Sequence, residues 1–147
     1  MDTKFQSQYI PYSQTGKFTK ITLDYTNGAS VLKDFYEHPV NIEGIKSAIA
    51  ERKKFNTNRQ LLVDQFTDQY KSFDNCDAIR ANIHALLDEN TFTICTAHQP
   101  NIFTGHLYFV YKILHTIKLD DSLKKELPDY HFVPVFFMGS EYTYLEE

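Results

Sequence analysis

Apolar residues in the first 90 positions recur every three or four residues, which places them on one face of a helix. Three successive stretches show this spacing: Ile42, Ile45 and Ile49; Leu62, Phe66, Tyr70 and Phe73; and Ile79, Ile83 and Leu86. Short polar segments separate these stretches. The pattern predicts three amphipathic helices, and hence a mainly helical region over residues 1–90.

Polar residues mark the expected starts of two of these helices. Asn41 follows Pro39 and directly precedes the first stripe, as an N-terminal capping residue does. In the sequence TNRQ, Thr57 and Gln60 have the spacing of a capping box, in which each side chain bonds to the backbone of the other residue. Gly44 argues against the first helix, because an interior glycine costs about 1 kcal/mol.

The spacing of the apolar residues changes after Asn90. Residues 91–97, TFTICTA, alternate their side chains as a strand does and are rich in β-formers. Residues 131–139, HFVPVFFMG, are almost continuously apolar, as expected of a strand buried on both faces, although Pro134 is unusual within a ladder. Between them, a predicted helix that ends before Pro128 has an apolar stripe of Leu107, Val110, Leu114 and Ile117.

These elements predict an α/β protein in two parts. Residues 1–90 form the N-terminal, mainly helical region, and residues 91–147 form a βαβ unit that begins a Rossmann-like parallel sheet. Two parallel strands alone would leave large apolar faces uncovered. We therefore expect the chain to be the N-terminal portion of a longer protein, held together either by its helical half or by pairing with another copy as a homo-oligomer.

Charge and cysteine content narrow the class of protein. The formal net charge of −4 argues against a nucleic-acid partner, and the short basic cluster Arg52-Lys53-Lys54 is expected to be the solvated end of a helix. Cys76 and Cys95 form neither a disulfide framework nor a metal-binding motif, and Cys95 is expected to pack within its strand. The first residues lack a secretory signal, and no segment is long and apolar enough for a membrane span. We expect a cytoplasmic protein that does not bind membranes.

Hydrogen-bonding side chains gather where the first predicted strand leads into the helix, in the sequence TAHQPNIFTGHLYF. Ligands of open α/β sheets bind at the carboxyl ends of strands, and a helix N-terminus attracts phosphate or carboxylate. The candidate residues in or near this loop are His98, Gln99, Asn101, Thr104, Gly105, His106 and Tyr108. Thr104 could cap the helix or donate to an anion. Gly105 would allow close approach of a ligand, and His106 could stack on a base, bind phosphate or carry protons.

A purely structural role competes with a functional one at several of these positions. Asn101 and Thr104, taken singly, are expected to satisfy backbone groups of the loop and the helix start. His98, Gln99 and His106, taken together, favour a ligand site. We predict no metal site, because two histidines without a third ligand at suitable spacing do not form a metal motif.

The second predicted strand also ends in polar residues. Ser140 and Glu141 follow it directly, at the edge of the sheet where the first loop is expected. Glu141 could bind an amine or act as a base, or it could be a solvated loop acid. Both interpretations remain open on the sequence alone.

The motif block TAHQPNIFTGHLYFVYKILHTIKL, followed by FVPVFFMGSE, resembles the BshC family of bacillithiol-synthesis cysteine-adding enzymes, or cysteine ligases. The stretches YIPYSQTGKF and HPVNIEGIKSAIAERKKFNTNRQLLVDQF also resemble that family's N-terminal region, so the resemblance covers nearly the whole chain. It implies a much longer, dimeric protein with a Rossmann-like core. It also implies condensation of cysteine with glucosaminyl-malate, with ATP or another nucleotide activating the carboxyl group.

The resemblance also implicates particular positions. By motif they are His98, Gln99, Asn101, Thr104, Gly105, His106, Tyr108, Lys112, Ser140 and Glu141, of which His98, His106 and Glu141 are the catalytic candidates. The chain departs from the family where acidic residues usually follow, because it has Tyr142 and Tyr144 there. In addition, FTGH is similar to the His-x-Gly-His loop of class I nucleotidyl transferases, with Phe103 in place of the first histidine.

Two functional hypotheses follow. In the first, the chain is the N-terminal portion of an ATP-dependent cysteine ligase and is inactive alone. In the second, it is a truncated, non-catalytic module for nucleotide binding or oligomerisation. The motif blocks favour the first, and the expected open edges of the sheet motivate the second.

Overall fold

The computed structural model describes residues 6–74 and 76–139. The chain forms two compact units, Met1–Ala50 and Glu51–Glu147, and the division falls within helix α3 (Ile42–Arg52). The second unit holds the elements that carry the candidate site, so the first is described briefly. The domain boundary expected at residue 90 stays a prediction.

The first unit contains short helices joined by tight turns. Its elements are α1 (Tyr12–Thr15), α2 (Lys20–Thr26), the 3-10 helix η1 (Ser30–Phe35) and most of α3. The side chain of Thr19 caps α2 by accepting from the Thr22 backbone N–H. None of these first three helices was predicted from the pattern, because each is too short for a repeating apolar stripe.

The start of α3 agrees with the sequence pattern. Asn41 Oδ1 accepts from the Gly44 backbone N–H at 2.9 Å, the bond of an N-terminal cap. Gly44 is required for packing, since a Cβ there would lie 1.8 Å from the Pro39 carbonyl oxygen. Glycine lowers the stability of the helix, but its lack of a side chain allows the first turn to contact the preceding chain.

The second unit contains a parallel βαβ unit preceded by two helices. Its elements are α4 (Arg59–Tyr70), α5 (Asp77–Ala85), β1 (Thr91–His98), α6 (Leu107–Glu126) and β2 (His131–Met138). The strands pair in parallel from Thr91 opposite His131 to His98 opposite Met138. Pro134 lies opposite Ile94 within the ladder. The predicted α/β class and the predicted strand–helix–strand order are confirmed.

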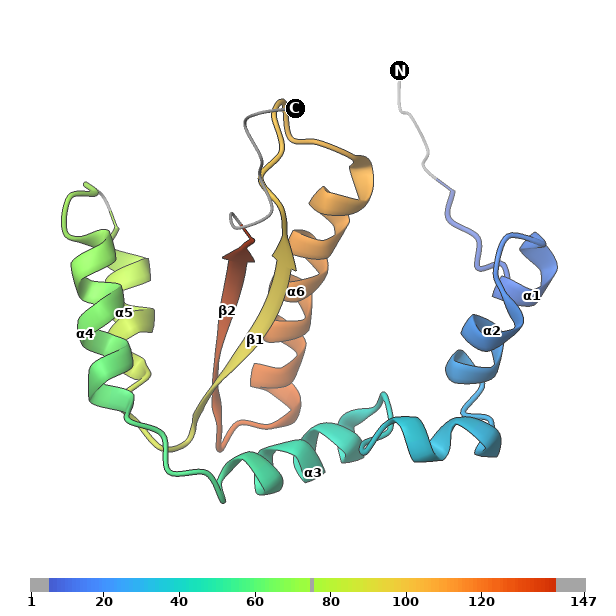
Figure 1. Cartoon of the computed structure of the whole chain (residues 1–147), viewed down its shortest axis with the longest axis horizontal. Coiled ribbons are helices and arrows are strands. Elements are labelled where there is room, and N and C mark those ends of the chain that lie inside the picture. The colour runs from blue at the N-terminus through green and yellow to red at the C-terminus, as the bar shows by residue number, and fades with distance from the viewer. Residues whose placement is uncertain (1–5, 75, 140–147) are drawn as a thin grey trace. The chain divides into compact units, whose positions relative to one another are not determined.

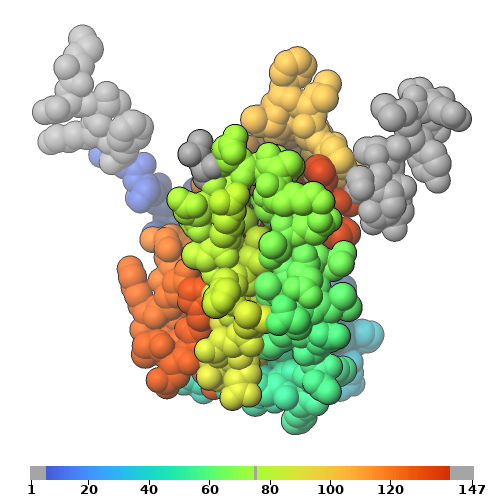
Figure 2. All heavy atoms as spheres, turned by 90° about the vertical axis from the view of Figure 1, so that its left-hand side faces the viewer, coloured from blue at the N-terminus to red at the C-terminus, as the bar shows by residue number. Residues whose placement is uncertain are grey.

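Helices cover both faces of this two-stranded sheet (Figure 1). α6 packs against β1 and β2, and α4 and α5 pack on the opposite face. Figure 2 shows α4 and α5 side by side along the outer surface of that layer. The core beneath them is a cluster of buried residues on α4, around α5 and on β2: Val63, Ile83, Leu86 and Val133.

Two predictions about helices in this unit are wrong. The α4 cap is Asn58, whose Oδ1 accepts from the Leu61 N–H at 3.1 Å, so Thr57 forms no capping box with Gln60. Thr57 instead accepts a hydrogen bond from Arg52. In α6, the predicted apolar stripe is largely exposed: Leu107 is 69% and Leu114 55% exposed. The buried residues of α6 lie on another face, namely Thr116, Asp120 and Leu123.

The strands are covered unevenly. Phe132 and Val133 are buried, whereas Phe136, Phe137 and Met138 at the end of β2 are exposed, so only the first half of β2 is buried on both faces as predicted. Cys95 is exposed on β1, contrary to the expected packing role, and Cys76 is buried. Among the described residues, no helix has the length and apolar character needed to cross a membrane.

Candidate functional site at the carboxyl end of strand β1

His98, the last residue of β1, is held by a network of hydrogen bonds. Its Nε2 lies 2.6 Å from the Tyr108 hydroxyl on the first turn of α6. Its Nδ1 lies 2.9 Å from the Gln99 carbonyl oxygen and 2.9 Å from the Asn101 side-chain nitrogen. Asn101 also donates to the Gln99 carbonyl at 3.0 Å. The predicted residues His98, Gln99, Asn101 and Tyr108 are therefore brought together.

Both neutral forms of the His98 imidazole fit this network. With its proton on Nδ1, the ring donates to the Gln99 carbonyl and accepts from the Tyr108 hydroxyl. With its proton on Nε2, the ring donates to Tyr108 and accepts from the Asn101 amide. Both ring nitrogens are occupied in either form. Tyr108 is the more exposed residue of this pair, at 50%, so a ligand can approach the pair from its side.

Aromatic rings surround Tyr108. The His106 ring stacks on the Tyr108 ring at a centroid distance of 5.6 Å and an interplanar angle of 9°. Phe109 meets the His98 ring edge-on at 5.5 Å and also contacts Phe136 of β2. Phe109 was missed as a supporting residue, although it directly follows Tyr108 and its apolar side chain could have indicated contact with the sheet. Phe109 thus links the His98 network to the sheet.

The loop enters α6 through a left-handed turn. Phe103, Thr104 and Gly105 have φ values of 51°, 65° and 63°. The two non-glycine residues are in a conformation that costs roughly 1–2 kcal/mol per residue. A Cβ at Gly105 would lie 2.6 Å from Asn101 Cβ, so glycine is required by its φ and by close contact with the residue that orients His98.

No side chain of the described residues caps the α6 N-terminus. Its N-cap residue is His106, and Thr104 does not cap it, which removes one of the two roles expected of Thr104. The Leu107 and Tyr108 backbone N–H groups lie at this positive end of the helix dipole, where an anion would be stabilised. His106 is exposed beside them.

Lys112 lies one turn further along α6 and is directed back to the strand. Its Nζ donates to the Ala97 carbonyl at 2.7 Å, so it ties α6 to β1. Ser140 and Glu141 lie outside the described residues. Gly139, the last described residue, donates from its N–H to the His98 carbonyl at 3.1 Å, which continues the pairing of the strands up to the candidate site.

This arrangement can supply two kinds of chemistry. The His98–Tyr108 pair can move a proton between its own oxygen and nitrogen atoms. The α6 N-terminus and His106 can bind an anionic group. Both features lie at the carboxyl end of β1, the edge where open α/β sheets bind ligands.

Comparison with known proteins places the chain in a family. The family described as "Bacillithiol biosynthesis BshC, N-terminal Rossmann-like domain" matches residues 5–147, nearly the whole chain. The chain belongs to the BshC family. Membership agrees with the predicted resemblance, and the observed βαβ unit agrees with the predicted Rossmann-like fold.

Relatives across bacteria show the same similarity. A protein of Flavobacterium johnsoniae named "Putative cysteine ligase BshC" is 43% identical over 140 residues, which cover 94% of this chain and 26% of that protein. Proteins with the same name from Flavobacterium psychrophilum and Christiangramia forsetii are each 42% identical, over 94% of this chain and 27% and 26% of their own lengths. The chain therefore spans about a quarter of the length of these BshC relatives.

Proposed function

We propose that this BshC domain is the N-terminal part of a cytoplasmic ligase that joins cysteine to glucosaminyl-malate in bacillithiol synthesis. The observation that carries the proposal is the family match over residues 5–147. The reaction forms an amide between the cysteine carboxyl group and the sugar amine. A nucleotide, ATP in the simplest case, activates that carboxyl group.

The residues at the carboxyl end of β1 fit a nucleotide phosphate. The start of α6, which no side chain of residues 6–74 and 76–139 caps, offers backbone N–H groups, and the exposed His106 ring adds a donor beside them. In the proposal, these groups hold the phosphates, and Gly105 allows them to approach the backbone. Thr104 and Gln99 lie in the same exposed loop and complete this wall of the site.

The His98–Tyr108 pair has a separate role in the proposal. Amide formation requires the attacking amine to lose a proton. Tyr108 presents its hydroxyl to the substrate, His98 exchanges a proton with that hydroxyl through Nε2, and Asn101 holds the ring. Ser140 and Glu141 follow β2 in sequence, and we assign them to binding the substrate amine.

The test uses the full-length protein from the same gene, with cysteine, glucosaminyl-malate and ATP as substrates. Wild-type protein should form a thiol-bearing amide, detected by mass spectrometry. Tyr108→Phe removes the hydroxyl that His98 Nε2 contacts and should lower kcat by about 100-fold. Tyr111→Phe is the matched control, because Tyr111 is also an exposed tyrosine of α6 and should retain activity.

Two results would contradict parts of the proposal. Absence of product with every nucleoside triphosphate, when an active relative succeeds in the same assay, would exclude the ligase function. Equal activity of the Tyr108→Phe and Tyr111→Phe proteins would instead retain the ligase function and exclude the role of the His98–Tyr108 pair.

A further inference from the structure

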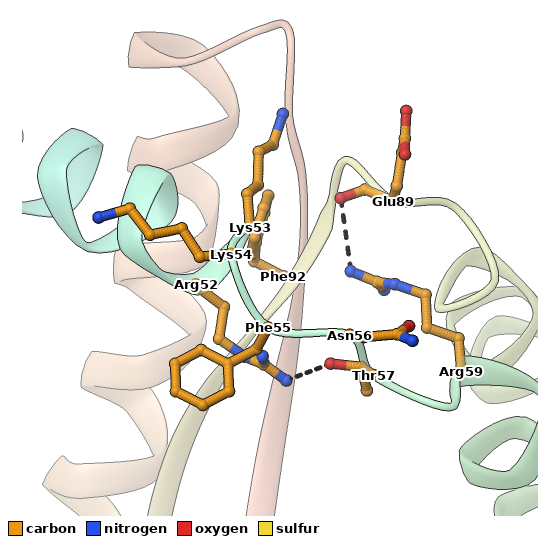
Figure 3. Close-up of a pocket in the computed structure, with 9 residues that line it drawn as sticks. All are labelled: Arg52, Lys53, Lys54, Phe55, Asn56, Thr57, Arg59, Glu89 and Phe92. Atoms are coloured by element: carbon orange, nitrogen blue, oxygen red, sulfur yellow. Dashed lines mark hydrogen bonds between the residues drawn. The ribbon is translucent and has the colours of Figure 1, made fainter.

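A pocket lies at the other end of β1. It has a volume of about 570 Å³ and lies wholly within the second unit, between the turn after α3, the start of α4 and the segment that enters β1. Four cations and one carboxylate line it, together with two phenylalanines: Arg52, Lys53, Lys54, Arg59, Glu89, Phe55 and Phe92. Figure 3 shows these side chains.

Three of the four cations have neutral partners. Arg52 donates to the Thr57 hydroxyl at 2.6 Å, and Lys53 donates to the Asn90 side-chain oxygen at 2.8 Å. Arg59 donates to the Leu86 and Thr91 carbonyls at 2.8 and 3.1 Å. Neutral oxygens orient a cation without cancelling its charge, so these contacts leave a positive potential in the pocket.

Nearby carboxylates do not neutralise these three cations within the described part of the chain. Glu51 pairs with Lys54, at 3.3 Å. Glu89 accepts from Arg59 through its backbone carbonyl at 3.4 Å, and its carboxylate points away from that guanidinium (Figure 3). Arg52 uses one N–H in the contact with Thr57, which leaves most of its donors for a ligand.

Aromatic side chains fix the cations in place. The Arg52 guanidinium lies 5.5 Å from the Phe55 ring centroid, and Lys53 Nζ lies 4.8 Å from that of Tyr130. Such contacts orient a cation but do not neutralise it. Arg59 is half-buried and bonds to three carbonyls at the entry to β1, so it also holds the backbone of the pocket.

We propose that this pocket binds a small ligand with two adjacent oxyanion groups, either phosphates or carboxylates. Arg52 and Lys53 contact the ligand, and Arg59 provides the buried part of the positive field. The volume is within the range of small-molecule sites, about 300–1,000 Å³. β1 spans eight residues, so this pocket lies roughly 25 Å from the polar loop and binds its ligand independently of the proposed ligase chemistry.

Calorimetry on the 147-residue chain tests the proposal at low ionic strength with two probes of similar shape, inorganic pyrophosphate and malonate. Binding that depends on Arg52 and Lys53 is expected, and it should weaken as KCl is added. Tighter binding of pyrophosphate would identify a phosphorylated ligand, and tighter binding of malonate would identify a dicarboxylate. Failure of both probes to bind at millimolar concentration would overturn the proposal.

Three variants locate the binding. Arg52→Gln and Lys53→Gln should each weaken binding by about tenfold, because each removes a charged donor. Lys71→Gln should leave it unchanged, since it removes an exposed charge from the other end of α4. Circular dichroism melting confirms that all variants fold. If His106→Ala abolishes binding while Arg52→Gln and Lys53→Gln do not, the anion binds at the start of α6 and the proposal is wrong.

Discussion

At the scale of single residues, Gly105 connects backbone conformation to the orientation of His98. It has a positive φ, and the space for its absent side chain is filled by Asn101. Asn101 in turn contacts His98 Nδ1. A side chain at position 105 would therefore move the residue that holds the imidazole.

We predict that Gly105→Ala displaces Asn101 and alters the His98 ring environment, at a cost of about 1–3 kcal/mol. NMR of the His98 ring signals would detect the change. Gly28→Ala is the control: its φ of 65° is close to the 63° of Gly105, but an added Cβ meets no atom within 4 Å. Identical His98 spectra for Gly105→Ala and the unmodified chain would contradict the steric argument.

A second residue-scale feature is the buried carboxylate of Asp120. Asp120 is 4% exposed, and Oδ2 accepts from Lys124 Nζ at 2.6 Å. Oδ1 has no hydrogen-bond partner among the described atoms. Within the described structure, Lys124 is therefore the positive charge that pairs with this carboxylate.

Lys124→Met should destabilise the chain by about 1–3 kcal/mol, because it leaves the Asp120 carboxylate buried and unpaired. The measurement is the free energy of unfolding in urea. Lys125→Met removes a neighbouring exposed charge from the same turn, so it controls for the helix dipole. An equal loss in the two variants would show that the ion pair contributes nothing.

At the scale of elements, α6 has apolar residues on more than one face. Leu123 is 2% exposed, while Leu114 on the same helix is 55% exposed. Leu123→Ala should lower the free energy of unfolding by about 2–4 kcal/mol, and Leu114→Ala by less than about 1 kcal/mol. Urea unfolding measures both variants. Each replaces leucine by alanine in the same helix, so the change in helix propensity is equal and the difference reports burial. Similar losses of unfolding free energy would mean that Leu114 is also buried in solution.

The same helix shows how far sequence pattern alone can go. The spacing predicted that residues after Leu107 form a helix, and the helix is present. The apolar spacing indicated the wrong face as the buried one, because Leu107 and Leu114 form as regular a stripe as the residues that are buried. The buried face includes Thr116 and Asp120, which are polar, so burial there depends on packing that no periodicity encodes.

The candidate site was predictable in location but not in its contacts. The boundary between the predicted strand and the predicted helix indicated that the site lies at the carboxyl end of β1. The bond between His98 and Tyr108 could not be predicted, because it depends on a left-handed turn that includes Phe103 and Thr104, residues that rarely adopt positive φ. The charged pocket was not predicted, because Arg52 and Arg59 line one pocket only after the turn that follows α3 has folded.

At the scale of the whole molecule, one cluster of buried hydrophobic residues belongs to a single unit. The cluster of Val63, Ile83, Leu86 and Val133 lies entirely after residue 50. We predict that a variant beginning at Ile42 retains this core and unfolds cooperatively. Dispersed methyl signals in its NMR spectrum would check the packing. Collapsed signals would mean that the first unit is needed for the core.

The unequal exposure of the two cysteines also has a practical use. Cys76 is buried and Cys95 is exposed on β1, so a maleimide fluorophore should attach selectively to the sheet of the native chain. In a longer BshC protein that contains this domain, the labelling rate of the same thiol would report whether the rest of that protein shields this face. The fluorescence of one labelled thiol could thus follow, in real time, the association of this domain with whatever covers the sheet.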